Sequence, residues 1–470
     1  MSGRVLVVTY FFPPLGGIAV QRSLKFATYL PRSGWQPVVV TPRNPGYTFV
    51  DRSLEEALPP ALEIHRTGSL EPGQLPNAVA RRLSRTKAGA GGVAGAGTRG
   101  TDLSKGPTSG GLPGRLLWKG MVVWNRVWVA SLFPDAQVGW VRLAARAGLR
   151  VHKERPVDAV YSSSGPISSH LAAERIAART GLPWIADFRD PWIGNAFVGS
   201  RRGVFGYMQR RIERRIVARA SRVVFATQGL LDAYAERYPW AAGHMVVIPN
   251  GYDRADFPIP GSVERDPSVG TRFHLIYGGS IYGDHELEVF LEGLELLVSR
   301  RPEVRDRLLV EFIGRLNVHN RAVAAACSSS PTIGQMVRFT GYLAHSEAMK
   351  RQAAADALLQ IVADGPAKSQ IHGGKLMEYL GQDKQILAVV PQGVAREVLR
   401  DLGWGIIADP PAEGVADGIE RLLAAPPVTG RADPEGRYDR VNQAAQLAAI
   451  LDEVVAESAR PATPDDARKR

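Results

Sequence analysis

The feature of this chain that most restricts its fold is an alternation of short, β-branched apolar runs with longer amphipathic stretches. The pattern is typical of parallel sheets covered by helices, because buried parallel strands are apolar on both faces and need helical connections. The first series of runs lies at residues 3–9, 36–41, 61–65, 157–161, 184–188, 222–226 and 245–248. The second lies at 272–277, 308–313, 336–340, 357–362, 385–390 and 404–407. We therefore predict an α/β fold with two parallel sheets.

Polar, Pro- and Gly-containing residues separate the two series and suit a linker. Residues 88–114 are rich in Gly, Ala, Ser and Thr and cannot supply a core, so we expect a flexible insertion there. Apolar residues at helical spacing near the C-terminus predict a final helix that packs along a domain face. The predicted division is an N-terminal domain at 1–250, a linker at 251–270, a C-terminal domain at 271–436, a helix at 437–460 and a disordered tail at 461–470.

The composition points to a reducing compartment. Cys327 is the only cysteine, so no intramolecular disulfide can form, and its apolar helical context indicates packing rather than a nucleophile. The first apolar run is too short for a signal peptide and reads as a buried strand. No stretch of about 18 uncharged apolar residues exists, which argues against a transmembrane helix. We expect a cytoplasmic protein, either free or peripheral at the inner face of the cell membrane.

Charge is distributed unevenly along the chain. Residues 1–250 hold 33 Lys and Arg against 15 Asp and Glu, whereas residues 251–470 hold 25 against 31. The first half is therefore the basic half of a chain whose net charge is +12. Such asymmetry is compatible with a nucleic acid, an anionic membrane or an acidic substrate, and counting charges does not choose among them.

The first predicted strand runs into a proline-fixed turn, the glycines Gly16 and Gly17, and then a helix. Glycine lets a phosphate approach backbone N–H groups at the positive end of a helix. An ordinary tight turn between strand and helix explains a single glycine pair equally well.

A second polar segment, Asp187-Phe-Arg-Asp-Pro-Trp192, ends the predicted strand at 184–188. Side chains at this end of a parallel strand face the crevice in which open α/β sheets bind ligands. The alternative is a structural ion pair between Arg189 and an aspartate. No His or Cys lies nearby as a ligand, so we expect no metal.

The second domain opens in the same way as the first, with a strand followed by Gly278, Gly279 and Ser280. Another turn between a strand and a helix follows at Phe312-Ile-Gly-Arg-Leu316. Two phosphate-type loops on two domains are less easily explained as ordinary turns than one loop.

A further glycine pair starts the segment Gly373-Gly-Lys-Leu-Met-Glu-Tyr-Leu-Gly381. Lys375 can offset the charge of a diphosphate, the helix N-terminus adds backbone donors, and the Glu378 carboxylate can accept both hydroxyls of a ribose. A solvated Lys–Glu pair on a helix surface is the alternative.

Taken together and in this order, these segments resemble the retaining, GT4-like glycosyltransferases of the GT-B fold, also called glycosyltransferase group 1. The resemblance runs from the first strand to the last helix, with 88–114 set aside. The matching segments are Tyr10-Phe-Phe-Pro-Pro-Leu-Gly-Gly17 with Val20-Gln-Arg22, Asp187-Phe-Arg-Asp-Pro-Trp192, Ile248-Pro-Asn-Gly-Tyr-Asp253 and Gly374-Lys-Leu-Met-Glu-Tyr-Leu380.

The resemblance implies two Rossmann-like domains with parallel sheets facing across a cleft, and a final helix that crosses back between them. It implies acceptor binding mainly by the first domain and nucleotide-sugar binding mainly by the second. The donor residues that it implies are Gly16, Gly17, Gly278, Gly279, Ser280, Arg315, Tyr342, Leu343, Gly374, Lys375 and Glu378. The candidates for the reaction centre are Arg189, Asp190, Lys375 and Glu378.

Two departures from the family pattern stand out. The family carries Glu-x7-Glu, and counting back from Glu378 places Gln370 at the first glutamate, which usually contacts the sugar. The family also tends to carry a basic residue after the Gly279-Ser-Ile-Tyr-Gly283 loop, where this chain has Asp284. We expect Arg315, in the neighbouring loop, to substitute for it.

Two segments of the basic half suit an anionic membrane surface. Residues 200–219 set Phe205, Met208, Ile212 and Ile216 against a dense arginine face, and residues 116–128 are apolar, Trp-rich and cationic. The alternative is a sheet-covering helix with a solvated face and a partly buried helix of the first domain.

The function that we predict is transfer of a sugar, of the hexosyltransferase type, from a nucleotide-diphosphate sugar to a hydroxyl of a glycan, glycolipid or secondary-metabolite acceptor, with retention and with no cofactor required. The alternative is a sugar-nucleotide-binding protein with weak or no transferase activity. Nucleic-acid binding is disfavoured, because the basic helix has no aromatic platform and no recognised motif accompanies it.

Overall fold

The computed structural model describes residues 3–43, 45, 50–71, 132–194, 203–259, 261–281, 286–362 and 374–460. The chain forms two compact units. Unit 1 comprises Met1–Phe225, Tyr234–Val246 and Ala444–Arg470, and unit 2 comprises Ala226–Ala233 and Val247–Gln443. The predicted insertion at 88–114, the segment 116–128, Gln370, Asp284 and the tail at 461–470 lie outside the described residues.

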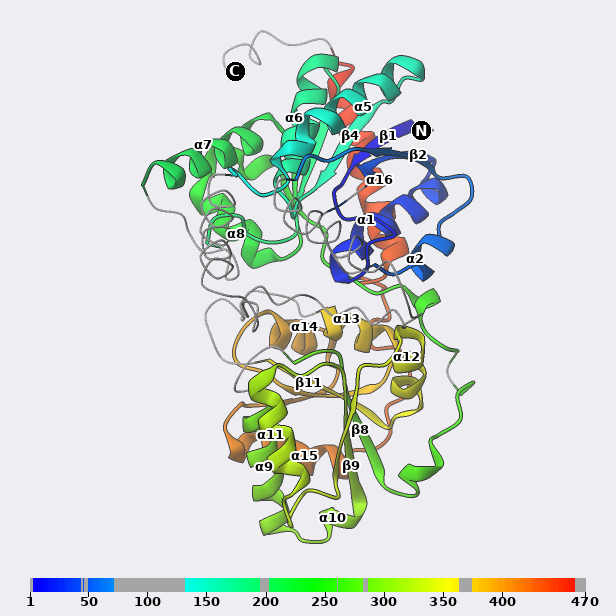
Figure 1. The fold of residues 1–470 in the computed structure, drawn as a ribbon, viewed down its shortest axis with the longest axis vertical. Coiled ribbons are helices and arrows are strands. Elements are labelled where there is room, and N and C mark those ends of the chain that lie inside the picture. The colour runs from blue at the N-terminus through cyan, green and yellow to red at the C-terminus, as the bar shows by residue number, and fades with distance from the viewer. Residues whose placement is uncertain are drawn as a thin grey trace, which may run out of the picture. The chain divides into compact units, whose positions relative to one another are not determined.

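Unit 1 is built on a seven-stranded sheet in the order β3-β2-β1-β4-β5-β6-β7. Figure 1 labels β1, β2 and β4 of this sheet. Its strands are β1 (Gly3–Val8), β2 (Trp35–Pro42), β3 (Glu63–Thr67), β4 (Ala159–Ser163), β5 (Trp184–Phe188), β6 (Arg222–Phe225) and β7 (Met245–Val247). The neighbouring strands from β3 to β6 are parallel. The order reverses between β1 and β4, which makes the carboxyl ends of these two strands the place where such sheets bind ligands.

Helices cover this sheet because the strands are apolar on both faces. The side chains of β1 from Val5 to Val8 are all fully buried, as expected for a strand with helices on either side. The helices of unit 1 before its last segment are α1 (Ile18–Tyr29), α2 (Ser53–Glu56), α5 (Val141–Glu154), α6 (Ser168–Thr180) and α7 (Gly203–Arg219), and α8 (Gln228–Arg237) lies between β6 and β7 in the sequence.

Unit 2 repeats the architecture with six strands in the order β10-β9-β8-β11-β12-β13. Its strands are β8 (Phe273–Gly278), β9 (Leu308–Ile313), β10 (Val337–Gly341), β11 (Ala357–Ile361), β12 (Gln385–Val389) and β13 (Ile406–Ala408). Its helices are α9 (Glu286–Arg300), α10 (Val304–Arg307), α11 (Val318–Ser328), α12 (His345–Ala354), α13 (Gly374–Gly381), α14 (Val394–Leu402) and α15 (Ala412–Ala424). Its neighbouring strands are parallel, and the order reverses between β8 and β11.

The two Rossmann-like units with parallel sheets confirm the predicted fold class, and each observed strand overlaps a predicted apolar run. The boundaries that we assigned to the domains and to the linker stay a prediction.

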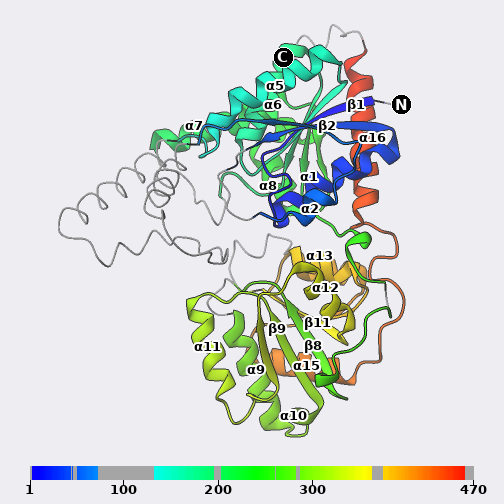
Figure 2. The same cartoon turned by 45° about the vertical axis from the view of Figure 1, so that its right-hand side comes forward.

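The last helix, α16 (Arg440–Ser458), is tied to unit 1 by polar contacts and by burial. The indole Nε1 of Trp35, at the start of β2, donates to Asp452 at 3.2 Å. Arg222, at the start of β6, donates to Glu457 at 3.0 Å. Leu447 and Leu451 are fully buried. The chain therefore completes the first unit with its last segment, as Figure 2 shows from a second direction.

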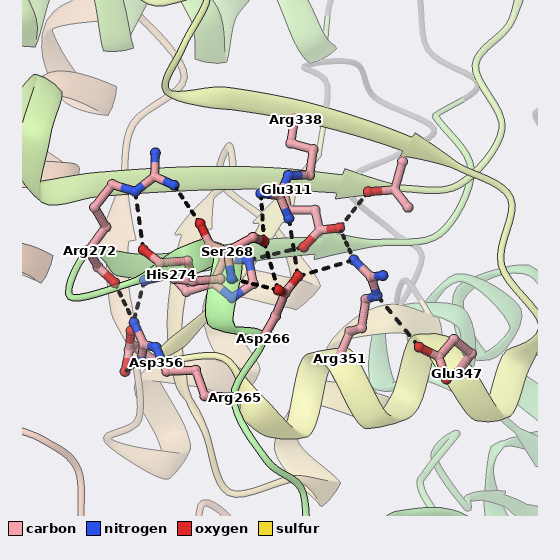
Figure 3. Close-up of polar contacts among 12 residues, drawn as sticks. Arg265, Asp266, Ser268, Arg272, His274, Glu311, Arg338, Glu347, Arg351 and Asp356 are labelled. Atoms are coloured by element: carbon pink, nitrogen blue, oxygen red, sulfur yellow. Dashed lines mark hydrogen bonds and ion pairs between the residues drawn. The ribbon is translucent and has the colours of Figure 1, made fainter.

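A polar network fixes the segment that leads into β8 (Figure 3). The fully buried Glu311 of β9 accepts from His274 of β8 at 3.0 Å and from Arg351 of α12 at 2.8 Å. Arg338 of β10 lies 3.3 Å from Asp266 in the segment before β8. Burial by itself would raise the pKa of Glu311, but the hydrogen bonds from His274 and Thr340 and the charge of Arg351 lower it below the ordinary value. Glu311 is therefore held as a carboxylate.

Candidate functional site

In unit 1, Gly16 and Gly17 form the turn between β1 and α1. Gly17 has φ of 93°, a conformation that side chains other than glycine rarely adopt, and it stands at the N-terminal cap position of α1. The first turn of α1 contains no acidic residue, and Gly17 provides no side-chain cap. Backbone N–H groups at such a helix start suit an anion.

The same edge of the sheet carries a buried ion pair that the sequence analysis did not identify. Arg22 of α1 forms two hydrogen bonds of 2.8 Å with Asp187 at the end of β5, and both side chains are at most 1% exposed. Tyr161 and Ser163 of β4 also donate to Asp187, at 2.6 and 2.9 Å. Burial would raise the pKa of Asp187, but Arg22 and these hydrogen bonds lower it. Asp187 is thus a structural carboxylate that joins α1, β4 and β5.

Arg189, two residues later, is anchored to backbone carbonyls. Its guanidinium donates to Ser164 O at 2.7 Å, to Gly165 O at 3.4 Å and to Ala19 O at the start of α1. The sequence also allowed an ion pair between Arg189 and an aspartate. In the structure, Asp187 forms its ion pair with Arg22 instead. The side chain of the neighbouring Asp190 is exposed.

His170, at the start of α6, is a further buried polar residue near this edge. Its Nδ1 lies 2.8 Å from Ser162 Oγ, which also accepts from Trp184 Nε1 at 2.8 Å. Burial lowers the pKa of His170 to about 3, with a smaller opposing effect of Asp187. His170 is therefore neutral at physiological pH and orders the core of unit 1.

In unit 2, two loops pack backbone against backbone at the carboxyl ends of β8 and β9. Gly279 N donates to Ile313 O at 2.7 Å, and Ile281 N donates to Arg315 O at 3.0 Å. A Cβ on Gly314, whose φ is 149°, would lie 2.2 Å from Gly279 O. Only glycine at this position allows so close an approach.

Lys375, in the first turn of α13, reaches into this loop. Its Nζ donates to Ser280 O at 3.1 Å and to the hydroxyl of Tyr277, and lies 4.0 Å from the centre of the Tyr277 ring. A Cβ on Gly279 would lie 2.6 Å from Lys375 Cε, so the absence of a side chain there makes room for the lysine. Burial lowers the pKa of Lys375 to about 8, opposed by the charges of Glu286 and Glu378.

Glu378 lies one helical turn after Lys375 on α13. Burial raises the pKa of its carboxyl group to about 7, while the charge of Lys375 acts in the opposite direction. Among the described residues, no side-chain hydrogen bond is made to this carboxylate. A partly buried acid that accepts no side-chain hydrogen bond within the described ranges is suited to hydroxyl groups of a ligand.

Arg315 and Tyr342 lie together in neighbouring loops of unit 2. The Arg315 guanidinium carbon is 4.8 Å from the centre of the Tyr342 ring, a cation–π arrangement. Tyr342 is 56% exposed, and Leu343 packs against the core that contains α13.

The structure thus places predicted donor residues of unit 2 in contact in two groups. In the first, Lys375 contacts the loop from Gly278 to Ser280. In the second, Arg315 contacts Tyr342. The sequence analysis missed two participants. Tyr277 is the last residue before the glycine pair, and its aromatic position gave a signal that we did not use. Arg22 lies in the Val20-Gln-Arg22 segment, but its partner is 165 residues away.

Two absences apply to the described part of the chain. It contains no group of three or more His, Cys, Asp or Glu residues arranged to hold a metal ion. No helix within the described ranges combines the length and the apolar character that a membrane span requires.

Comparison with known proteins identifies the class of domain. Residues 107–256 match the family model described as Glycosyltransferase Family 4. No curated protein matches the chain in sequence.

Solved structures match nearly the whole chain in fold. HepE from Anabaena, in complex with UDP and glucose, aligns with a TM-score of 0.56 and 14% identity over 96% of this chain and 100% of its own. Trehalose 6-phosphate synthase from Burkholderia multivorans gives 0.57 and 14% over 98% and 100%. Sucrose-phosphate synthase from Thermosynechococcus elongatus gives 0.51 and 14% over 97% of each chain. These similarities establish the two-domain GT-B fold.

Proposed function

We propose that this chain, which carries a glycosyltransferase family 4 domain and has the GT-B fold, transfers a hexose from a nucleotide-diphosphate sugar to an acceptor hydroxyl. Residues 271–436 bind the donor in this proposal, and residues 1–250 bind the acceptor. The contact of Lys375 with the Gly278–Ser280 loop carries the proposal, because it sets a cation and a glycine turn at the carboxyl end of β8.

The donor diphosphate is the natural ligand of this loop. Phosphate oxygens approach backbone N–H groups where no side chain intervenes, and the nearby ammonium group of Lys375 offsets their charge as the leaving group departs. The start of α13, at Gly374, adds backbone donors. Arg315 supplies a second cation in place of the basic residue expected after Gly283. Gly16 and Gly17 contribute backbone donors from unit 1.

The nucleoside occupies the neighbouring positions in this proposal. Glu378 accepts the two ribose hydroxyls, and the backbone of Tyr342 and Leu343 meets the base. We take UDP as the first nucleotide to test, because HepE was solved with UDP. No metal is needed, since cationic side chains and backbone donors serve the diphosphate.

The residues that we propose for catalysis are Arg189 and Asp190 of unit 1 and Lys375 and Glu378 of unit 2. Breaking the anomeric C–O bond develops positive charge on the sugar ring and negative charge on the diphosphate. Lys375 stabilises the negative charge directly. We propose transfer with retention, which anomeric analysis of the product tests.

The acceptor is proposed to be a glycan, a lipid-linked sugar or a small molecule, met at the cytoplasmic face of an anionic membrane. Val204, Phe205, Tyr207 and Met208, in the first turns of α7, are all more than 40% exposed. Ile216, which we had assigned to the same apolar face, is instead fully buried in unit 1. Only the first half of α7 is therefore available to a membrane, while its second half covers the sheet.

Release of nucleoside diphosphate from a panel of nucleotide sugars, with and without acceptors, tests the enzyme. Lys375→Met should lower turnover by about 100-fold, the usual cost of losing one group that stabilises developing charge. Lys350→Met, at an exposed position of α12, is the matched control and should leave turnover unchanged. Tight donor binding without any turnover would favour the alternative, a sugar-nucleotide-binding protein.

A further inference from the structure

Unit 1 has a groove on the outer faces of two neighbouring helices. Helices α5 and α6 lie side by side in both views of the fold (Figures 1 and 2), and they pack closely. The groove between them has a volume of about 300 Å³. Four arginines and an alanine line it, and we call it the arginine groove: Arg142, Ala145 and Arg146 from α5, and Arg175 and Arg179 from α6.

The spacing of these arginines concentrates positive charge in one place. Arg142 and Arg146 are four residues apart on α5, and Arg175 and Arg179 are four residues apart on α6, so each pair lies on one helix face. Like charges at this spacing destabilise a helix. None of the four guanidinium groups forms an ion pair with a carboxylate within the described ranges.

The carboxylate of Glu174, which precedes Arg175 on α6, is already occupied. Glu174 is 5% exposed and accepts from Arg215 at 3.1 Å and from Arg219 at 2.8 Å, both on α7. Burial lowers the pKa of Arg175, Glu174 opposes this effect, and the positive charges of Arg142 and other neighbouring arginines add to it. Within the described ranges, the groove therefore has an excess of positive charge, which Glu174 only partly offsets.

We infer that the arginine groove binds a phosphate-bearing polyanion of the diphosphate class, either a soluble phosphate ester or an anionic lipid headgroup. Guanidinium groups bind phosphate oxygens in a bidentate manner, and two arginine pairs on facing helices suit two linked phosphates. This site is separate from the donor residues of unit 2 and goes beyond the proposed transferase activity.

Equilibrium dialysis with inorganic pyrophosphate tests the groove. Every protein in the test carries Lys375→Met, which removes the proposed donor lysine. A failure of the groove proposal can therefore be distinguished from a failure of the proposed donor site. Arg142→Gln/Arg175→Gln should weaken pyrophosphate binding by about tenfold or more for each arginine, the usual loss for a charge-assisted hydrogen bond. These side chains are exposed, and circular dichroism verifies that the variant remains folded.

The matched control removes two positive charges from a part of the chain outside the arginine groove. Arg305→Gln/Arg307→Gln lies on α10, where both side chains are exposed, and it should change the affinity by less than about twofold at fixed ionic strength. Equal losses in the two double variants, or pyrophosphate binding that the groove substitutions leave unchanged, would overturn the proposal.

Vesicles identify the source of the phosphate. Phosphatidylcholine vesicles that contain phosphatidylglycerol should displace pyrophosphate from the Lys375→Met protein if the ligand is a lipid headgroup. Their cosedimentation with the protein should then be lost in Arg142→Gln/Arg175→Gln. Pyrophosphate binding that persists in the presence of these vesicles identifies a soluble phosphate ester.

Discussion

At the scale of single residues, the proposed donor contacts of Lys375 and Glu378 predict a pH range for donor binding. The pKa of Lys375 is lowered to about 8, so its attraction for a diphosphate falls as the pH rises through 8. The pKa of Glu378 is raised to about 7, so it loses the charge that accepts ribose hydroxyls as the pH falls through 7. Calorimetric titration with a nucleotide-diphosphate sugar should therefore give the highest affinity between pH 7 and 8.

The losses of donor affinity at low pH and at high pH have separate causes. Glu378→Gln should abolish the loss of affinity on the acidic side and leave the alkaline loss in place. An affinity that does not change between pH 6 and 9 would contradict the assignment of both residues to the donor.

Asp187 belongs to the same scale, although its role is structural. Asp187→Asn leaves the buried Arg22 without its counter-charge, which should lower the free energy of unfolding by about 3–5 kcal/mol. Because folding lowers the pKa of Asp187, the stabilisation is complete above its unfolded-state pKa and is lost as the pH falls through the folded one. Urea unfolding at neutral pH measures the difference in the free energy of unfolding between Asp187→Asn and the unmodified protein.

An exposed ion pair is the control for this experiment. Glu457→Gln breaks the pair between α16 and Arg222, in which the Glu457 side chain is 50% exposed, and should cost at most about 1 kcal/mol. A similar loss from both substitutions would show that burial of the Arg22–Asp187 pair does not matter.

At the scale of elements, the contact between the two loops that we propose for donor binding depends on one glycine. Gly314→Ala places a Cβ 2.2 Å from Gly279 O at a φ of 149°, so it should displace the Gly278–Ser280 loop and weaken nucleotide-sugar binding by at least about tenfold. Gly403 ends α14 at a φ of 60° and has open space around it. The control Gly403→Ala should therefore cost about 1 kcal/mol of stability and leave donor binding unchanged. Calorimetric titration with a nucleotide-diphosphate sugar compares the donor affinity of the two variants.

The elements were largely predictable from the sequence, because buried parallel strands are short and continuously apolar. Runs such as 308–313 coincide with a strand, here β9, and α13 begins at Gly374, a member of the glycine pair that predicted a helix start. Boundaries were less certain at an edge: β13 occupies Ile406–Ala408 rather than 404–407. Edge strands have fewer buried side chains and so a weaker pattern.

The geometry of the candidate site was predictable where it depends on local sequence, as in the glycine turns and the Lys375–Glu378 spacing. It was not predictable where it depends on pairing between distant segments. Arg22 and Asp187 meet only after α1 and β5 pack in one unit, and the short segments around them do not reveal that contact. The same holds for Lys375 and Tyr277, which are 98 residues apart.

At the scale of the whole molecule, the chain returns to unit 1 with its last helix. Leu447 of α16 is fully buried, so Leu447→Ala should lower stability by about 2–5 kcal/mol through the cavity that it leaves. Because Ala444–Arg470 belong to unit 1, the loss should appear in the unfolding of that unit. Tryptophan fluorescence follows it, since all the tryptophans except Trp404 belong to unit 1. The exposed Glu453→Ala is the control. Equal effects would mean that α16 does not stabilise unit 1.

Donor binding by unit 2 is the central claim, and calorimetric titration with a panel of nucleotide-diphosphate sugars, beginning with UDP-hexoses, tests it most directly. We predict that at least one donor binds the unmodified protein and binds Lys375→Met at least about tenfold more weakly, with Lys350→Met unchanged. A panel in which no donor binds, or in which Lys375→Met binds as tightly as the unmodified protein, would contradict the account.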